Sequence, residues 1–335
     1  MIAAAIAGIA LAQAAAMPAV PRTPEGHPDL NGVWSNASIT LLTRPRGVDK
    51  LVVDEAEAKR MTAASGNVRR AENDAKPTAA SVGAPSDGNT EAGYNAFWLD
   101  PGMTMAKVNG TYRTSWIVNP ANGQLPTKPE AEALARRSFA RQRNAPQGPE
   151  DLAPNDRCII GSRGSGGPGM LNNLYNNNYQ IVLTRDALAI DIEMVHDVRT
   201  IPIFKSKAEA RAHHRPAALQ LWLGDSVAWW EGDALMVETT HVNPEQGAYG
   251  PIFLSADGVV TESFRRTSAD QITYAFDVVD PAYYTQPWRA EMSFNAMNGQ
   301  VFEYACHEGN YAMEGILQGA RDDEAKAAKA AARKP

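Results

Sequence analysis

Apolar and polar residues alternate in short runs along the second half of the chain, as they do in β-strands. The runs occupy residues 226–230, 234–242, 259–266, 271–279, 288–294 and 301–307, and short turns join most of them. Six strands within about 90 residues favour an antiparallel meander that curls on itself. We therefore predict a mainly β fold, a barrel or a strongly curved sheet, with a few peripheral helices and long loops.

The clearest alternation spans residues 189–199, which we predict to be one strand. Its apolar face would hold Ile190, Ile192, Met194, His196 and Val198, and its other face Asp191, Glu193, Asp197 and Arg199. A histidine would then lie in an apolar row, with acids and a base on the opposite face. Directly before this run, residues 172–179 form the densest polar cluster of the chain, which includes Asn177, Asn178 and Tyr179.

Helical patterns occupy residues 54–70, 129–144 and 206–215, and a hairpin is expected around Asn109-Gly110. The third helix ends in His213 and His214, which we expect to be solvated, because successive helical residues diverge too far to chelate one ion together. Residues 73–91, rich in small and polar residues, indicate a loop.

The net charge of the chain limits the classes of molecule that it is expected to bind. The 335-residue chain has a formal net charge of -6 and no basic stripe. Nucleic acid and anionic membranes are therefore poor partners.

The N-terminus resembles an export signal. Residues 2–11 are apolar, and the alanine-rich residues after them offer a signal-peptidase site near Ala14 or Ala16. The run is too short to span about 30 Å of hydrocarbon, so no stable membrane insertion is expected. We predict a periplasmic or secreted protein with a signal peptide at 1–16, an extended linker at 17–28, a single barrel-like domain at 29–320 and an Ala/Lys-rich tail at 321–335.

The chain has two cysteines, Cys158 and Cys306. An even count in an oxidising compartment indicates a disulfide. The alternative is a pair of buried thiols.

The common catalytic signatures are missing from the sequence. It has no His-Glu-x-x-His, no Gly-x-Ser-x-Gly and no dinucleotide-binding fingerprint, and the glycine-rich residues 161–169 lack the Gly-Lys-Ser/Thr ending of a phosphate loop. We expect no cofactor. A metal held by His196, His307 and a carboxylate such as Glu308 or Asp197 has no supporting spacing.

Acid/base chemistry is the remaining hypothesis. Burial would favour neutral His196 as a base, and His307 or Tyr179 would return the proton. Arg199 would bind a phenolate or carboxylate or stabilise developing negative charge. The expected substrate-binding residues are Asn177, Asn178, Asp197, Trp222, Trp230, Tyr304, Glu308 and Tyr311. Structural roles are the alternatives: a strand histidine that satisfies a backbone group, turn-forming asparagines and core tryptophans.

Several motifs resemble a large family of exported, mostly uncharacterised bacterial proteins. They are Trp222-Leu223-Gly224-Asp225-Ser226, Trp230-Glu231-Gly232-Asp233 and the segment Tyr304-Ala305-Cys306-His307-Glu308-Gly309-Asn310-Tyr311. The resemblance covers roughly residues 25–320. Separately, Gly32-Val33-Trp34 is similar to the opening strand of lipocalin-like barrels, where the tryptophan closes the barrel floor. A core tryptophan at a strand start is the alternative.

The family resemblance implies a weak association with lyases that act on lignin-derived aromatics. We therefore expect a cofactor-independent periplasmic enzyme that uses acid/base chemistry on a small aromatic compound. A lyase that removes formaldehyde from an aromatic dimer is one example. Two alternatives stay open: a lipocalin-like binding protein for a small apolar ligand, and a metal-dependent hydrolase.

Overall fold

Nine strands close into a mixed β-barrel in a computed structural model that describes residues 20–74, 99–143, 146–161 and 164–332. In barrel order they are β1 (Gly32–Ser35), β6 (Asn178–Leu183), β7 (Ala187–Ile192), β8 (Asp197–Phe204), β9 (Asp225–Glu231), β10 (Ala234–Thr240), β11 (Val259–Arg266), β12 (Gln271–Val279) and β13 (Trp288–Ala296). β13 pairs with β1 and closes the ring, and β5 (Ile117–Asn119) lies beside β13. The predicted mainly β barrel is confirmed.

One pair of neighbours departs from the predicted antiparallel meander. β8 and β9 run parallel, whereas the other neighbouring strands of the ring are antiparallel. The chain between them crosses the outside of the barrel and contains α4 (Lys207–Ala212). A parallel pair needs such a long connection, because the chain must return to the same end of the sheet. The parallel pair therefore separates two antiparallel meanders, β6–β8 and β9–β13.

The strands β11 and β12 have the bounds that the alternation predicts, and the Asn109-Gly110 hairpin is present. It joins β3 (Lys107–Val108) to β4 (Thr111–Arg113), with Asn109 and Gly110 at positive φ (50° and 77°). The prediction of a strand at residues 301–307 was wrong. That segment is irregular and leads into α6 (Tyr311–Ala331), which begins ten residues before the predicted tail.

The predicted single strand at residues 189–199 is also wrong. The chain makes a hairpin there: β7 ends at Ile192, the turn contains a 3-10 segment (Met194–His196), and β8 begins at Asp197. Val195 and His196 have positive φ (62° and 54°), which reverses the chain. As a result Val198 is exposed, whereas Asp197 and Arg199 are buried, so the expected inner and outer faces of β8 are exchanged.

Aromatic and aliphatic side chains fill the barrel interior. The rings of Tyr179, Phe294 and Tyr274 stack in that order, with neighbouring centroids 5.1 and 5.0 Å apart, and Phe276 lies tilted against Tyr274 at 5.7 Å. All four are fully buried. Trp34 on β1 is buried too, and its indole N–H donates to the Leu30 carbonyl at 3.0 Å. The interior is thus a packed core.

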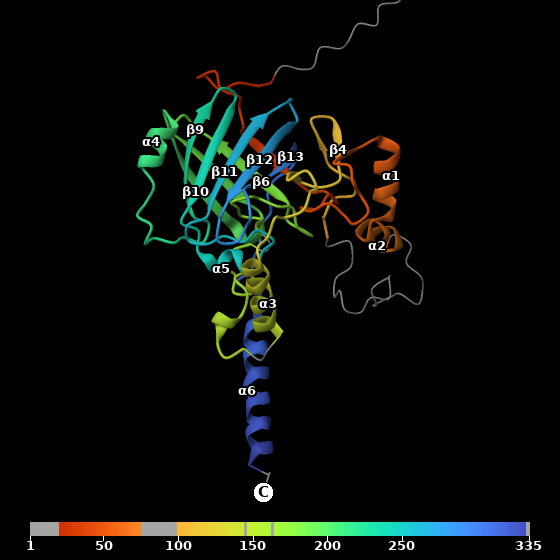
Figure 1. Cartoon of the computed structure of the whole chain (residues 1–335), viewed down its shortest axis with the longest axis vertical. Coiled ribbons are helices and arrows are strands. Elements are labelled where there is room, and N and C mark those ends of the chain that lie inside the picture. Colours follow the sequence, from red (N-terminus) through yellow and green to blue (C-terminus); the bar gives the residue numbers. More distant parts are fainter. Residues whose placement is uncertain (1–19, 75–98, 144–145, 162–163, 333–335) are drawn as a thin grey trace, which may run out of the picture.

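Smaller elements surround the barrel (Figure 1). On one side β2 (Val52–Val53), β3 and β4 form a three-stranded sheet beside α1 (Glu55–Ala64) and α2 (Gly66–Asp74). On the other side α4 packs on β8 and β9. At the lower end in this view are α5 (Pro244–Gly247), α3 (Pro129–Arg143) and the projecting α6. In the part of the chain that the structure describes, no helix combines the length and apolarity needed to span a membrane.

The predicted linker at residues 17–28 is a folded loop in the part that the structure describes. Residues 22–28 form a closed loop, with a bridge between Arg22 and Pro28, instead of an extended segment. The predicted signal peptide at 1–16, residues 17–19, and residues 75–91 of the expected loop lie outside the described residues.

Candidate functional site

A polar network crosses one side of the barrel interior. The Arg199 guanidinium donates to both carboxylate oxygens of Glu262, at 2.9 Å for Oε1, and the two side chains are 2% and 0% exposed. The Tyr274 hydroxyl donates to Glu262 at 2.6 Å. Burial acts to raise the pKa of Glu262, but the charge and hydrogen bonds of Arg199 outweigh it and lower the pKa below the ordinary value. The pair is therefore ionised, and it fixes the position of Arg199.

The glycine-rich residues 164–171 lie against this network. The Met170 N–H donates to the Tyr274 hydroxyl at 3.0 Å. Gly167 has a φ of 86°, and a Cβ there would lie 2.7 Å from the Arg199 guanidinium. A residue without a side chain is needed where backbone and guanidinium come so close. The glycines of this stretch thus serve packing around Arg199.

A cleft opens in the barrel wall where β8 and β9 separate. The two strands pair only at Ile203–Ala228 and Phe204–Trp229, at the end of β8. Below these pairs the strands leave a cleft of about 330 Å³, which falls in the range of small-molecule sites. Its lining is apolar at Val198, Ile201, Pro202, Leu221 and Leu223.

Arg199 and Ser226 belong to the interior polar network and also line the floor of the cleft. The guanidinium lies 3.4 Å from Ser226 Oγ and 3.3 Å from Thr239 Oγ1. Its Nε is buried and has no hydrogen-bond acceptor among the described residues. Because it is buried, this N–H does not reach the cleft surface, and Arg199 contributes to the floor through the rest of its side chain.

His213 and Arg215 stand at the rim of the cleft. His213 Nδ1 lies 2.8 Å from the Glu209 carbonyl oxygen, so in the neutral ring Nδ1 carries the proton and Nε2 keeps its lone pair. The ring stacks on Phe204, with centroids 4.4 Å apart. The prediction that His213 is exposed is confirmed, but its place beside the cleft was not foreseen.

His214 is half-buried, so the expectation that it is solvated was wrong. Its Nδ1 lies 2.8 Å from Asp225 Oδ2, and its Nε2 lies 3.6 Å from Glu238 Oε1. Arg211 donates to Glu238 at 2.9 Å. Because Asp225 and Glu238 point outward from β9 and β10, these contacts fasten the α4 crossover to the barrel wall.

The two histidines predicted as acid and base do not meet. His196 lies in the β7–β8 turn and is exposed, and its Nε2 accepts a hydrogen bond from the Tyr304 N–H at 2.9 Å. His307 is exposed in a turn after residue 305, and no hydrogen bond, ion pair or ring contact joins it to His196. The lone pair of His196 therefore has a structural partner, which is the alternative that the sequence left open.

The other predicted catalytic residues, Tyr179 and Arg199, both lie inside the barrel. The Tyr179 hydroxyl accepts a hydrogen bond from the Asn36 amide and donates to the Ser165 carbonyl, each at 3.2 Å. Burial raises the pKa of Tyr179 far above its ordinary value, so it is a poor acid. Of the four residues, only Arg199 lines the cleft.

The predicted polar ligand-binding residues have local structural roles. The Asn177 side chain holds the 172–178 turn through Asn173 N–H and carbonyl groups, and Asn178 donates to Glu193 at 2.8 Å. Asp197 Oδ2 accepts from the Gly161 N–H at 2.7 Å. Burial raises the pKa of Asp197 to about 6, although this hydrogen bond lowers it in part.

The predicted aromatic residues are dispersed. Trp222 lies under the Arg157 guanidinium, Trp230 stacks on His27 at the top of the barrel, and Tyr304 packs against the core. Tyr311 and Glu308 are exposed near the start of α6. The structure therefore does not bring these residues into one pocket.

The predicted disulfide is present: Cys158 and Cys306 are bonded, with their Cα atoms 5.8 Å apart. It ties the loop before the glycine-rich stretch to the irregular segment before α6. An oxidising compartment is consistent with such a bond.

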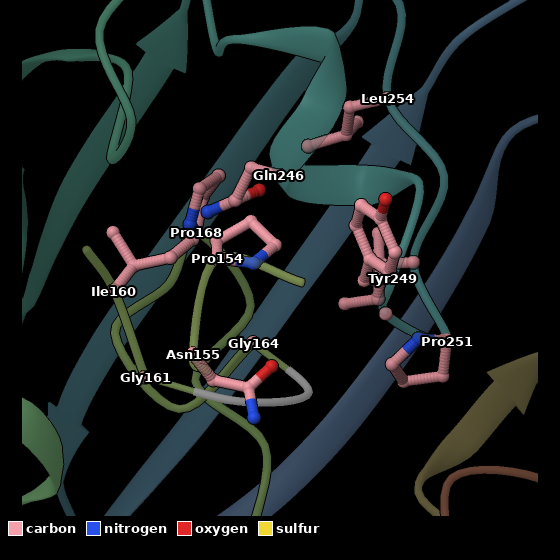
Figure 2. Close-up of a pocket in the computed structure, with 12 residues that line it drawn as sticks. Pro154, Asn155, Ile160, Gly161, Gly164, Pro168, Gln246, Tyr249, Pro251 and Leu254 are labelled. Carbon is pink, nitrogen blue, oxygen red and sulfur yellow. The ribbon is translucent and has the colours of Figure 1, made fainter. Parts of the chain in front are cut away.

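A second cavity lies at the lower end of the barrel, between the glycine-rich stretch and α5 (Figure 2). Gln246 and Tyr249 reach into it from the α5 segment, opposite Pro154, Asn155 and Ile160. Its volume of about 20 Å³ has room for about one water molecule. It is too small for an organic ligand.

No protein-family model, curated protein or solved structure matches the chain. In the described ranges, no group of three or more His, Cys, Asp or Glu side chains is placed to hold a metal ion.

Proposed function

We propose that the protein is an exported, cofactor-independent enzyme that acts on a small aromatic molecule in the β8–β9 cleft, and that it is a lyase. The observation that carries the proposal is that one cleft is lined by Arg199 and Ser226 at its floor and by His213 at its rim, whose Nε2 has no partner among the described residues. A donor for negative charge and a base together are the minimum equipment for acid/base catalysis.

The cleft favours a substrate with a flat ring and an anionic or developing anionic oxygen. Val198, Pro202 and Leu221 supply an apolar wall for the ring. Arg199 and Ser226, which line the floor, would supply a terminal guanidinium N–H and an O–H as donors for the oxygen. Since Arg199 is already paired with Glu262, it would act mainly as a directed donor, and less as a net positive charge.

We propose His213 as the general base, in place of the predicted His196. In formaldehyde loss from a hydroxymethyl side chain, Nε2 of His213 takes the hydroxyl proton. The O–H electron pair forms the C=O bond of formaldehyde, and the pair of the broken C–C bond passes to the carbon beside the ring. The imidazolium then returns its proton to that carbon. Arg199 and Ser226 would stabilise the negative charge during the step.

The test is turnover by the purified protein, with chelator present, of aromatic compounds that carry a hydroxymethyl side chain and a phenol or carboxylate. Formaldehyde release and product mass are measured together. We expect His213→Gln to lower kcat by about 10²- to 10⁴-fold, the usual contribution of a general base. His307→Gln is the matched control, since His307 is an exposed histidine outside the cleft.

Two outcomes would overturn the proposal. If His213→Gln turns over like the unmodified protein while His196→Gln is inactive, the site is not the cleft. If no compound is turned over but one binds saturably, and Ser226→Ala weakens that binding, the cleft belongs to a binding protein without catalysis.

A further inference from the structure

A second, larger opening lies at the opposite end of the barrel from the disulfide. It is a groove of about 740 Å³ between three segments: the N-terminal loop at residues 22–28, the β6–β7 turn, and the ends of β8 and β9. In Figure 1 this end is at the top, where the first described residues cross the barrel. The groove has more than twice the volume of the β8–β9 cleft.

One wall of the groove is a pair of stacked rings. The imidazole of His27 lies on the indole of Trp230, with centroids 4.1 Å apart and planes inclined by 2°. Phe204, Ile203 and Leu183 extend the apolar surface. Flat apolar walls of this kind fit a planar aromatic ring, which loses little freedom when it binds.

Two polar groups in the groove lack protein partners. The Thr23 hydroxyl is buried and has no hydrogen-bond partner among the described residues. The Lys205 ammonium has no carboxylate or carbonyl partner in the same residues, whereas Arg185 is already paired with Asp186 at 3.1 Å and faces Glu25. Glu25 also lines the groove, so the groove's two cations are matched in number by two carboxylates; Lys205 and Glu25 are the charges without a direct ion pair among the described residues.

We infer that this groove is a second small-molecule site, which takes a planar aromatic carboxylate. The ring would lie against Phe204 and the Trp230–His27 stack, with the carboxylate on Lys205 and, once the Thr23 side chain turns toward the groove, a hydrogen bond to its hydroxyl. The groove is open with the N-terminal loop in place, so the loop forms a wall of the site. The inference uses none of the cleft residues and does not depend on the proposed lyase activity.

Isothermal titration with 2-naphthoate tests the site. The matched probes are 2-naphthylmethanol, which has the same rings and no charge, and decahydronaphthalene-2-carboxylate, which has the charge but no flat ring. We expect 2-naphthoate to bind the unmodified protein more tightly than either. Lys205→Gln should weaken 2-naphthoate about tenfold, the worth of a hydrogen bond to a charged group, and leave 2-naphthylmethanol unchanged.

The control variant is Lys207→Gln. Lys207 lies two residues further along, over Trp229 on the outside of the barrel, and is not part of the groove. We expect its affinity for 2-naphthoate to equal that of the unmodified protein, and Thr23→Val to weaken binding about threefold to tenfold, as a lost hydrogen bond does. The inference fails if Lys205→Gln and Lys207→Gln bind alike. It also fails if only Ser226→Ala changes the affinity, because the probe then occupies the cleft.

Discussion

Two arginine–carboxylate pairs with the same forked geometry hold different regions of this barrel. Arg199 and Glu262 pair inside the wall beside the β8–β9 cleft, with side chains 2% and 0% exposed. Arg22 and Asp233 pair at the top of the barrel, with both oxygen contacts at 3.0 Å and side chains 48% and 49% exposed. The first fixes a cleft residue, and the second fastens the N-terminal loop to the β9–β10 turn.

Geometry alone does not set the strength of these two ion pairs, because their burial differs. In the interior neither charge can turn to water, so removing one partner leaves the other uncompensated. At the top, water and salt replace the lost partner, and exposed pairs contribute about 0–1 kcal/mol. The cleft is therefore built on a rigid support, while the wall of the upper groove is held by a weak one.

Asp197 is a third carboxylate, and its surroundings differ from those of Glu262 and Asp233. Asp197 is nearly as buried as Glu262 but pairs with a backbone N–H of Gly161 and with no arginine. The pKa of Asp197 is raised to about 6 by burial, whereas the pKa of Glu262 is lowered because Arg199 outweighs the same effect. Burial destabilises a carboxylate charge unless a cation accompanies it.

The largest effect is expected from breaking the buried pair. Glu262→Gln leaves the Arg199 charge uncompensated in the core and should lower the free energy of unfolding by about 3–5 kcal/mol. Urea denaturation measures it. Asp277→Asn is the matched control, because Asp277 pairs with Arg289 on the partly exposed outer face, and its loss should cost below about 1 kcal/mol.

A double variant sharpens this prediction. Arg199→Met with Glu262→Leu removes both charges and should recover most of the stability lost in Glu262→Gln, since a well-packed apolar pair often replaces a buried ion pair without penalty. Equal stability losses for Glu262→Gln and Asp277→Asn would contradict the contrast between inside and outside.

Much of the barrel could be predicted because its strands alternate locally. In β11, Val260, Glu262 and Phe264 share the inward face. A carboxylate in an apolar row is a signal for a buried, paired charge, and it marks Glu262 from sequence alone. Glu262 was not among the predicted site residues. The parallel pairing of β8 and β9 could also have been predicted from the sequence. A helix was expected at residues 206–215, between two predicted strands, and a long helical connection allows two strands to run parallel.

The candidate site was harder to predict, for two physical reasons. The β7–β8 turn places Val195 at positive φ, a conformation that β-branched residues rarely adopt, so no local rule indicates a turn there. The cleft also depends on contacts between distant residues, such as Arg199 with Glu262, 63 positions apart. The alternation of apolar and polar residues predicts which side chains share a face of a strand. It does not predict which neighbouring strands will separate to leave a cleft.

An intermediate effect on the free energy of unfolding is expected from Asp197, a buried carboxylate that has no arginine partner among the described residues. Because the pKa of Asp197 is about 6 when folded and 3.8 ordinarily, the folded protein binds this proton more tightly than the unfolded chain between about pH 4 and 6. The resulting stabilisation is fully present below about pH 4 and is lost as pH rises through 6, by at most about 3 kcal/mol. Asp197→Asn mimics the protonated side chain, so it should gain stability relative to the unmodified protein between pH 4 and 7.

Unfolding free energies of both proteins at pH 4, 5, 6 and 7 measure this gain, and their difference cancels groups that titrate in both. A difference that stays constant over this pH range would mean that folding does not raise the pKa of Asp197.

The smallest effect is expected from the exposed pair at the top of the barrel. Arg22→Ala should lower the free energy of unfolding by less than about 1 kcal/mol, and by less still at 1 M salt, where the pair is screened. Its local effect should be larger: amide hydrogen exchange at residues 23–28 should speed up, because Arg22 also donates to the Gly26 carbonyl at 2.6 Å and closes the loop. Exchange in β11 should not change. If Arg22→Ala instead costs as much as Glu262→Gln, the loop is an integral part of the barrel, and the contrast between the two pairs does not hold.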